Sequence, residues 1–153
     1  MPAGKLKKFL DERGTKYVCI AHSPAFTAQE IAASAHVPGR ELAKTVIVEL
    51  DGKPAMAVLP ANRKIVLQDL REVTGCDRAK FASEEAFEKE FPDCETGAMP
   101  PFGNLYGMDV FVAESLGEND EIAFNAGSHT EVIKMAYHDF ERLVQPKVLS
   151  FTT

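Results

Sequence analysis

The stretch LAKTVIVELDGKPAMAVLP, from Leu42 to Pro60, decides how the rest of this chain can fold. Two apolar runs rich in Val, Ile and Ala flank Asp51-Gly52, a pair whose glycine readily takes the positive φ of a tight hairpin turn. The stretch therefore predicts a β-hairpin around which the remaining elements are arranged.

Lys44 opens the first strand of this hairpin. Side chains alternate along a strand, so Lys44 shares a face with Val46, Val48 and Leu50. Two interpretations remain open for such a lysine. Its stem can lie along the core while its ammonium reaches water, or the cation can sit at the mouth of a pocket and attract a carbonyl or phosphate oxygen.

The segments around the hairpin alternate between short helices and short strands. Apolar spacing and capping residues, including a T-x-x-E box at Thr27 and Glu30, predict the following elements. We expect helices over 4–13, 28–35, 68–74, 83–91 and 137–144, and strands over 16–20, 79–81, 108–113, 121–125 and 132–135. Because the order lacks a regular βαβ rhythm, it predicts one α+β domain over 1–153 with a curved, mixed, mainly antiparallel sheet.

Composition limits the kinds of partner and compartment. The chain has 153 residues, 45% hydrophobic content and a net charge of -6, which suit one core and disfavour the coating of long nucleic acids. Cys19, Cys76 and Cys94 contain no CxxC pair, which favours a reducing compartment. No signal peptide or long apolar run is present, so we expect a cytoplasmic protein that does not contact a membrane.

Several common chemistries lack their motifs. The four histidines are far apart and form no H-E-x-x-H pattern, so no metal site or other cofactor is predicted. The segment GAMPPFGN lacks the Lys-Ser/Thr of a phosphate loop, and no G-x-S-x-G motif is present. Each cysteine is better explained as a small buried hydrophobe than as a nucleophile.

Two glycine-containing loops are the remaining candidates. In the loop from Gly97 to Gly103, glycine permits close backbone approach to a ligand and Pro100-Pro101 stiffens the chain. A plain connector between a helix and a strand is the alternative. Gly127-Ser128-His129 follows a predicted strand, and its histidine fits either a site residue or a partly buried hydrogen-bonding ring.

Taken together, these segments resemble the YbaK/ProX family of aminoacyl-tRNA deacylases, which is related to the editing insertion of bacterial prolyl-tRNA synthetase. The resemblance rests on the order and spacing of motifs along most of the chain. They are H-x-P-x-x-T-x-x-E from His22 to Glu30, the lysine of LAKTVIV, the strand ending AVLP, the helix ending VTG, G-x-x-x-P from Gly97 to Pro101 with the following PFG, and GSH at Gly127 to His129.

The resemblance implies a free-standing, metal-free enzyme that hydrolyses the ester between a wrongly attached amino acid and the terminal adenosine of a tRNA. Lys44 matches the family lysine thought to hold the terminal nucleotide or the ester carbonyl. The loop from Gly97 to Pro101 matches the backbone that faces the ester, and His129 matches a site histidine. The implied partner is the tRNA acceptor end, and an aminoacyl-tRNA synthetase partner is left open.

The candidate residues fall into three groups. The predicted catalytic residues are Lys44, Gly97 and His129, and the predicted substrate-binding residues are Phe26, Thr27, Thr45, Met99, Pro100, Pro101, Phe102, Gly103, Gly127 and Ser128. Ala55 and Ala57 are further candidates for the amino-acid pocket, and Arg40, Arg63 and Lys64 for contacts with tRNA phosphates.

Two other functions are compatible with the same residues. One is a non-catalytic module that binds an aminoacyl or nucleotide ligand beside a synthetase, which the acidic charge and the lack of an obvious general base favour. The other is hydrolysis of a small free ester or amide without tRNA.

Overall fold

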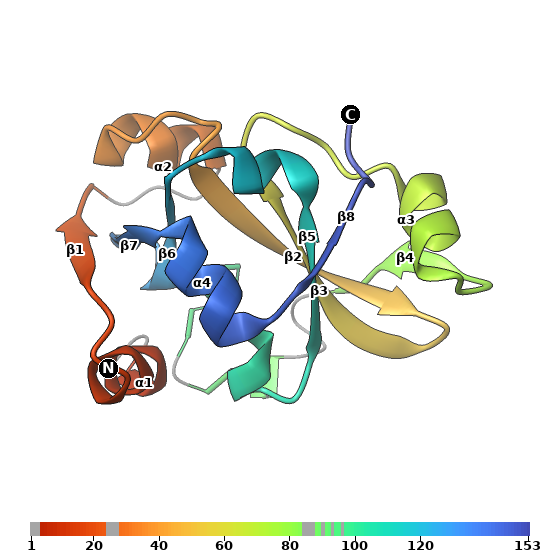
Figure 1. The fold of residues 1–153 in the computed structure, drawn as a ribbon, viewed down its shortest axis with the longest axis horizontal. Helices are drawn as coiled ribbons and strands as arrows, with labels where there is room; N and C mark the ends of the chain where they lie inside the picture. Colours follow the sequence, from red (N-terminus) through yellow and green to blue (C-terminus); the bar gives the residue numbers. More distant parts are fainter. Residues whose placement is uncertain (1–3, 24–27, 84–87, 90, 93, 96) are drawn as a thin grey trace.

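The computed structural model describes residues 4–23, 28–83, 88–89, 91–92, 94–95 and 97–153 (Figure 1). The α-helices are α1 (Gly4–Glu12), α2 (Ala28–Ala35), α3 (Leu67–Thr74) and α4 (Tyr137–Val144). The strands are β1 (Tyr17–Ala21), β2 (Leu42–Leu50), β3 (Lys53–Pro60), β4 (Ala79–Phe81), β5 (Asp109–Ala113), β6 (Glu121–Ser128), β7 (Glu131–Ala136) and β8 (Lys147–Leu149). Short 3-10 helices are η2 (Gly103–Leu105) and η3 (Glu114–Glu118). In these ranges no helix is long and apolar enough to cross a membrane.

The predicted hairpin is confirmed over its whole length. Strands β2 and β3 pair antiparallel from Ala43 with Pro60 to Leu50 with Lys53. Asp51 and Gly52 both have positive φ, 54° and 81°, as a tight two-residue hairpin turn requires. The Asp51 carboxylate also accepts hydrogen bonds from the backbone N–H groups of Asp77 and Arg78, which ties the hairpin tip to the segment entering β4.

All the strands belong to one sheet, in the order β1-β7-β6-β2-β3-β5-β8, with β4 paired to β2. The pairs β1–β7, β6–β7, β2–β3 and β2–β4 are antiparallel, and β2–β6, β3–β5 and β5–β8 are parallel. The antiparallel pairings join more residues in total than the parallel ones, so the predicted α+β fold with a mixed, mainly antiparallel sheet is confirmed.

Two strands differ from the sequence prediction. Strand β8 was not predicted, because three residues carry no readable periodicity and its pairing with β5 is non-local. Strand β6 was predicted to end at Asn125 but continues to Ser128 through an irregular register between Asn125 and Ser128. A bulge of this kind breaks the alternation on which a strand prediction depends. The predicted helix over 83–91 and the capping box at Thr27 fall largely outside the described residues.

The sheet is covered on both faces, and the two coverings leave one part of β2 open. On one face, α1, α4 and the chain around Phe102 form the largest apolar cluster with Ala43 and Ile47 of β2. On the other face, α2 packs over Leu42 at one end of β2 and α3 packs over Val48 at the other. Figure 1 shows these two helices at opposite ends of the strand. Lys44 lies on this second face, between them.

The aromatic centre of the larger cluster contains Phe102, one of the predicted binding residues. The Phe102 side chain is fully buried, and its ring lies 5.5 Å from those of both Phe124 and Phe140. Met99 belongs to the same cluster, and Pro100 and Pro101 are buried. The side chains from Met99 to Phe102 therefore pack against the core, and their part in substrate binding stays a prediction. Ala55 and Ala57 are likewise buried, beneath α3.

Gly103, one of the predicted substrate-binding residues, is required for packing. A Cβ atom at this position would lie 2.7 Å from both the backbone oxygen of Met108 and Cγ2 of Val110. Neither the backbone nor a β-branched side chain can move aside without disturbing β5. Glycine is therefore needed here for close approach of the chain.

Gly103→Ala is expected to destabilise the fold by about 1–3 kcal/mol and to lower Tm by several degrees, because overpacking strains the core. Thermal unfolding measures this effect. Gly39→Ala is the matched control, because its Cβ would meet Asn62 at an ordinary 3.6 Å. Equal Tm values for the two variants would contradict this role for Gly103.

Candidate active site

The edge of β2 opposite β3 is only partly paired. Strand β6 pairs with Leu42 and Ala43, and β4 pairs with Val48 to Leu50. Ile47 is also bonded on this edge, since its carbonyl accepts the Ala82 N–H at 3.0 Å. Between these contacts the middle of β2 has no neighbouring strand on this edge among the residues that the structure describes.

The backbone of Thr45 faces this opening. Leu50 and Lys53 close the hairpin turn, and hydrogen-bonded pairs then recur at every second residue, which directs the N–H and C=O of Thr45 away from β3. A strand edge of this kind supplies a fixed N–H donor beside whatever occupies the opening.

A small cavity lies in this opening. Its volume is about 150 Å³. It is lined by Ile31 of α2, Leu42, Ala43, Lys44, Thr45 and Val46 of β2, Asn125 of β6 and Gly97 of the glycine loop. Of the predicted site residues, Lys44, Thr45 and Gly97 are therefore brought together although they are far apart in sequence.

Lys44 is half-buried in this position. Burial lowers the pKa of its ammonium below the ordinary value, and the nearby charge of Lys64 lowers it further. No carboxylate forms an ion pair with Lys44 in the part of the chain that the structure describes. The site therefore holds a partly desolvated cation that an anionic or strongly polar ligand would stabilise.

The two glycine loops are bonded to each other. The Glu95 N–H donates to the Gly127 carbonyl at 2.7 Å, and the Gly127 N–H donates to the Ala98 carbonyl at 3.0 Å. Gly97 and Gly127 both have positive φ, 86° and 88°, where other residues would be strained. Gly127 therefore helps to hold Gly97 against the cavity without lining the cavity itself.

His129 lies beside this junction. Its Nε2 atom is 3.9 Å from Oε2 of Glu95, and its side chain is 12% exposed. It is not among the described residues that line the cavity. Glu95 was not recognised from the sequence, because nothing in the local pattern relates it to a histidine so far along the chain.

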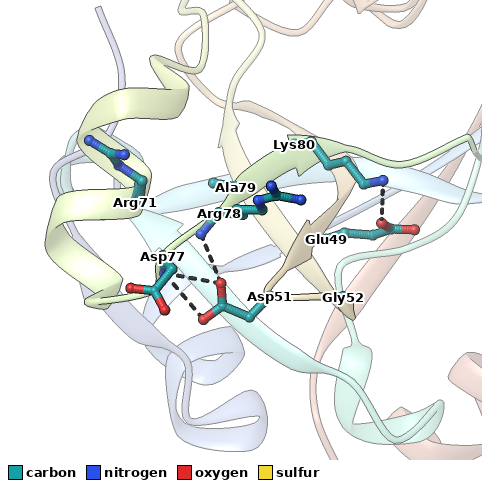
Figure 2. Close-up of a pocket in the computed structure, with 8 residues that line it drawn as sticks. All are labelled: Glu49, Asp51, Gly52, Arg71, Asp77, Arg78, Ala79 and Lys80. Atoms are coloured by element: carbon teal, nitrogen blue, oxygen red, sulfur yellow. Dashed lines mark hydrogen bonds and ion pairs between the residues drawn. The ribbon is translucent and has the colours of Figure 1, made fainter.

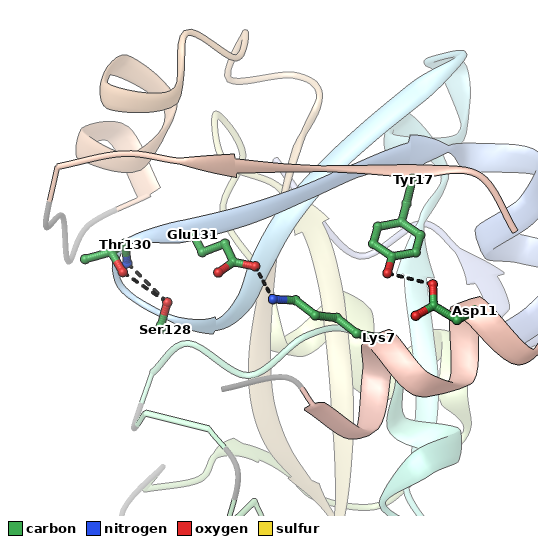
Figure 3. A network of polar contacts seen from close by, with 6 residues as sticks. All are labelled: Lys7, Asp11, Tyr17, Ser128, Thr130 and Glu131. Atoms are coloured by element: carbon green, nitrogen blue, oxygen red, sulfur yellow. Dashed lines mark hydrogen bonds and ion pairs between the residues drawn. The ribbon is translucent and has the colours of Figure 1, made fainter. Parts of the chain in front are cut away.

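Ser128 is engaged in the turn between β6 and β7, where its Oγ lies 3.3 Å from Oγ1 of Thr130 (Figure 3). The next residue, Glu131, forms an ion pair with Lys7 of α1. Ser128 is 4% exposed and is not among the described residues that line the cavity, so its part in binding stays a prediction. These contacts attach α1 to the hairpin that carries His129.

Asn125 is a lining residue that sequence analysis missed. Its Oδ1 atom is buried and has no hydrogen-bond partner among the described residues. Buried polar atoms are nearly always paired, so an unpaired one beside a cavity suits a ligand that donates a hydrogen bond. An asparagine inside an apolar strand is unusual, so the sequence did mark Asn125 as a candidate. Which way its side chain points, however, depends on the register of β6. Phe26 and Thr27 lie outside the described residues.

A larger cavity, of about 840 Å³, lies at the hairpin tip between α3 and β4 (Figure 2). It contains none of the predicted site residues. Three of its charged groups serve the fold, since Lys80 pairs with Glu49 at 3.2 Å and Asp51 accepts backbone N–H groups. Its size alone therefore does not make it the better candidate.

Two named relatives match this chain along most of its length. The Multifunctional Ser/Thr-tRNA deacylase ProXp-y of Escherichia coli (strain K12) is 26% identical over 152 residues, covering 96% of this chain and 90% of the relative. The Prolyl-tRNA editing protein ProX of Acetoanaerobium sticklandii is 25% identical over 143 residues, covering 89% and 86%.

A solved structure of a candidate trans-editing enzyme for prolyl-tRNA synthetase shares the fold. It superposes with a TM-score of 0.83 at 17% identity, covering 99% of this chain and 96% of that one. The predicted YbaK/ProX-like resemblance is thus confirmed. The aminoacyl-tRNA editing domain family matches residues 22–143, which include β2, β6 and the glycine loop, and the chain belongs to that family.

Proposed function

We propose that this chain removes a small, wrongly attached amino acid from the 3′ end of a tRNA, in trans, at the cavity between β2, β6 and Gly97. As a member of the editing family it is an aminoacyl-tRNA deacylase, that is, an ester hydrolase. The observation that carries the proposed site is the shared cavity of Lys44, Thr45 and Gly97. At about 150 Å³ it has room for a small amino acid, so the adenosine lies at its mouth.

Ester hydrolysis needs a positioned water and donors aimed at the oxygen that becomes negative. The Lys44 ammonium and the Thr45 N–H are the donors that the cavity offers. Among the described lining residues there is no carboxylate and no imidazole, so a hydroxyl of the ribose or of the amino acid relays the proton. It takes a proton from the attacking water while its own proton passes to the ester oxygen that leaves. Asn125 accepts a hydrogen bond from the substrate.

His129 acts at a distance from the reacting atoms. Through Glu95 it holds the junction of the two glycine loops, and this makes it a positioning residue. We further propose that the chain works as one domain over 1–153 in the cytoplasm, where tRNA is charged, and that a synthetase is a partner.

A panel of charged tRNAs tests both the proposed function and the role of Lys44. Release of amino acid is measured from tRNAs charged with Ser, Thr, Ala or Cys, and we expect turnover of at least one. Lys44→Ala is expected to lower kcat/KM about 10²–10³-fold, because a donor to the oxyanion is lost. Lys53→Ala, an exposed lysine of β3, is the control. Equal rates for wild type and Lys44→Ala on every substrate would reject the site.

A double-mutant cycle tests the positioning role of His129. We expect His129→Ala and Glu95→Gln each to lower kcat about tenfold, and the double variant to lose no more than either single variant, because both act through one contact. Additive losses in the cycle would show that the two residues act separately.

The partly buried charge of Lys44 is also expected to lower the free energy of unfolding. The lowered pKa belongs to the folded state only, whereas the unfolded chain keeps the ordinary value of 10.5. The unfolded state therefore binds more protons between the lowered pKa and 10.5, and stability rises with pH in that window. Below it, where Lys44 is charged in both states, the cost is fully present.

Lys44→Met is accordingly expected to raise Tm at pH 7 by about 1–3 °C, and the gain should shrink toward pH 10.5. Calorimetry at the two pH values measures it. Lys53→Met is the control, since that side chain is 72% exposed. An unchanged or lower Tm of Lys44→Met at pH 7 would contradict the claim that the Lys44 charge destabilises the folded state.

A further inference from the structure

Another small cavity lies next to the proposed site, at the end of the hairpin away from its turn. Its volume is about 180 Å³. Pro60, one of its lining residues, pairs with Ala43 across the hairpin, and Ala43 lines the proposed site. Facing residues of an antiparallel pair lie about 5 Å apart, so one such pair separates the two cavities. The described lining residues are Arg40, Pro60, Asn62, Arg63, Ser115, Glu118 and Asn119.

The walls of this cavity are segments that lie far apart in sequence and are bonded to one another. The Asn119 side chain, just after η3, donates to the Arg40 carbonyl at 2.8 Å. The Ala61 N–H, just after β3, donates to the Gly39 carbonyl at 3.1 Å. The segment before β2 is therefore fastened both to η3 and to the chain that leaves β3. These bonds fix the backbone on three sides of the cavity.

Two guanidinium groups line the cavity, and neither is fully engaged. Arg63 donates through Nη1 to the Thr153 oxygen at 2.8 Å, and Nη2 of Arg40 lies 3.6 Å from the Glu41 carboxylate. A guanidinium has five N–H donors, so each contact uses only part of its group. The Arg40 side chain is also 68% exposed, which makes its ion pair weak. The remaining donors suit a phosphate group, which guanidinium groups bind with two parallel hydrogen bonds.

Ser115 is an independent indication of a ligand. Its Oγ atom is buried and has no hydrogen-bond partner among the described residues. Buried polar atoms are nearly always paired, and a hydroxyl can donate as well as accept. Because Ser115 lines the same cavity as the two arginines, an oxygen-rich ligand in the cavity would supply the missing partner.

One carboxylate also lines the cavity. Glu118 is exposed and forms no ion pair in the ranges that the structure describes. The two arginines outnumber it, so the cavity favours an anion although the chain has a net charge of -6. Glu118 opposes that anion, and this opposition can be measured.

The proposed substrate contains an anion at the required place. In an aminoacylated tRNA end, the ester is neutral and the amino group of the amino acid is positive. The nearest negative group is the phosphodiester on the 5′ side of the terminal adenosine, and a single ribose joins it to the ester. An ester in the proposed site therefore brings this phosphodiester to the neighbouring cavity.

We propose that the cavity of Arg40, Arg63 and Ser115 binds the phosphodiester on the 5′ side of the terminal adenosine. This inference rests on the proposed function, because it takes the acylated tRNA end as the ligand. It assigns these residues to binding of the tRNA, while the chemical step stays in the neighbouring cavity. Lys64, the third cation that the sequence suggests for phosphate contacts, is not among the described lining residues.

Binding of an uncharged CCA trinucleotide tests the cavity without any chemistry. Arg40→Ala is expected to weaken binding about five- to tenfold and to reduce its dependence on salt, because a phosphate contact is lost. Glu118→Gln is expected to tighten binding about twofold, because it removes a like charge. Arg71→Ala is the control for a lost surface charge, since Arg71 is exposed on α3 and lines the larger cavity.

Ser115→Ala separates a binding role from a structural one. The hydroxyl has no partner in the free protein, so its removal should leave Tm unchanged or slightly higher. The affinity for the trinucleotide should fall about threefold. A lower Tm with unchanged affinity would contradict the binding role of Ser115.

Kinetics on two esters of the same amino acid complete the test. On aminoacyl-tRNA, Arg40→Ala is expected to raise KM about five- to tenfold with kcat within twofold, and on the aminoacyl nucleoside, which has no phosphate, to match wild type. Equal losses on both esters would overturn the proposal, as would equal trinucleotide affinity of Arg40→Ala and wild type or an equal loss in Arg71→Ala. If no ester is hydrolysed, the proposed function fails, and the trinucleotide still decides the role of the cavity.

Discussion

The incomplete pairing of β2 is the constraint on which the rest of the site depends. Its inner edge is bonded along the hairpin to β3, but its outer edge meets β6 at one end and β4 at the other. The backbone of Thr45 and the side chain of Lys44 are therefore held by a fully formed ladder on one side and face an opening on the other. A site built on such a strand is rigid without being filled.

The opening persists because its surroundings are supported independently. Phe102, Phe124 and Phe140 pack the opposite face of the sheet, and α2 and α3 cover the two ends of β2 on the site's own face. The glycine loop reaches the cavity because it is bonded to the backbone at Gly127. The motifs that looked like parts of one binding loop thus divide into a lining residue, Gly97, and core residues that hold the loop in place.

Electrostatics oppose stability at this site. The chain carries a net charge of -6, yet Lys44 forms no ion pair with a carboxylate in the described structure. A partly desolvated cation without a carboxylate partner is unfavourable in the free protein and becomes favourable when an anion binds. An acidic protein can in this way hold the end of a tRNA without attracting its whole length.

The sequence by itself determined the local elements and the family. The Asp51-Gly52 turn, the alternation in the hairpin and the spacing of the helices were readable because each depends on neighbouring residues, and the order of motifs identified the aminoacyl-tRNA editing fold. Lys44 and Gly97 were recognisable as candidates for the same reason. Their roles stay predictions, but their positions beside one cavity agree with the expectation.

Only the tertiary structure decided which candidates face the cavity and which support it. Phe102 and Gly103 turned out to be packing residues, and Asn125, Glu95 and the parallel strand β8 were not foreseen. Each of these depends on contacts between residues far apart in the chain: the register of β6 past its bulge, the approach of η2 to β5, and the return of residues 151–153 to Lys64. Such long-range contacts depend on which elements cover each face of the sheet. A pattern of neighbouring residues does not encode this arrangement.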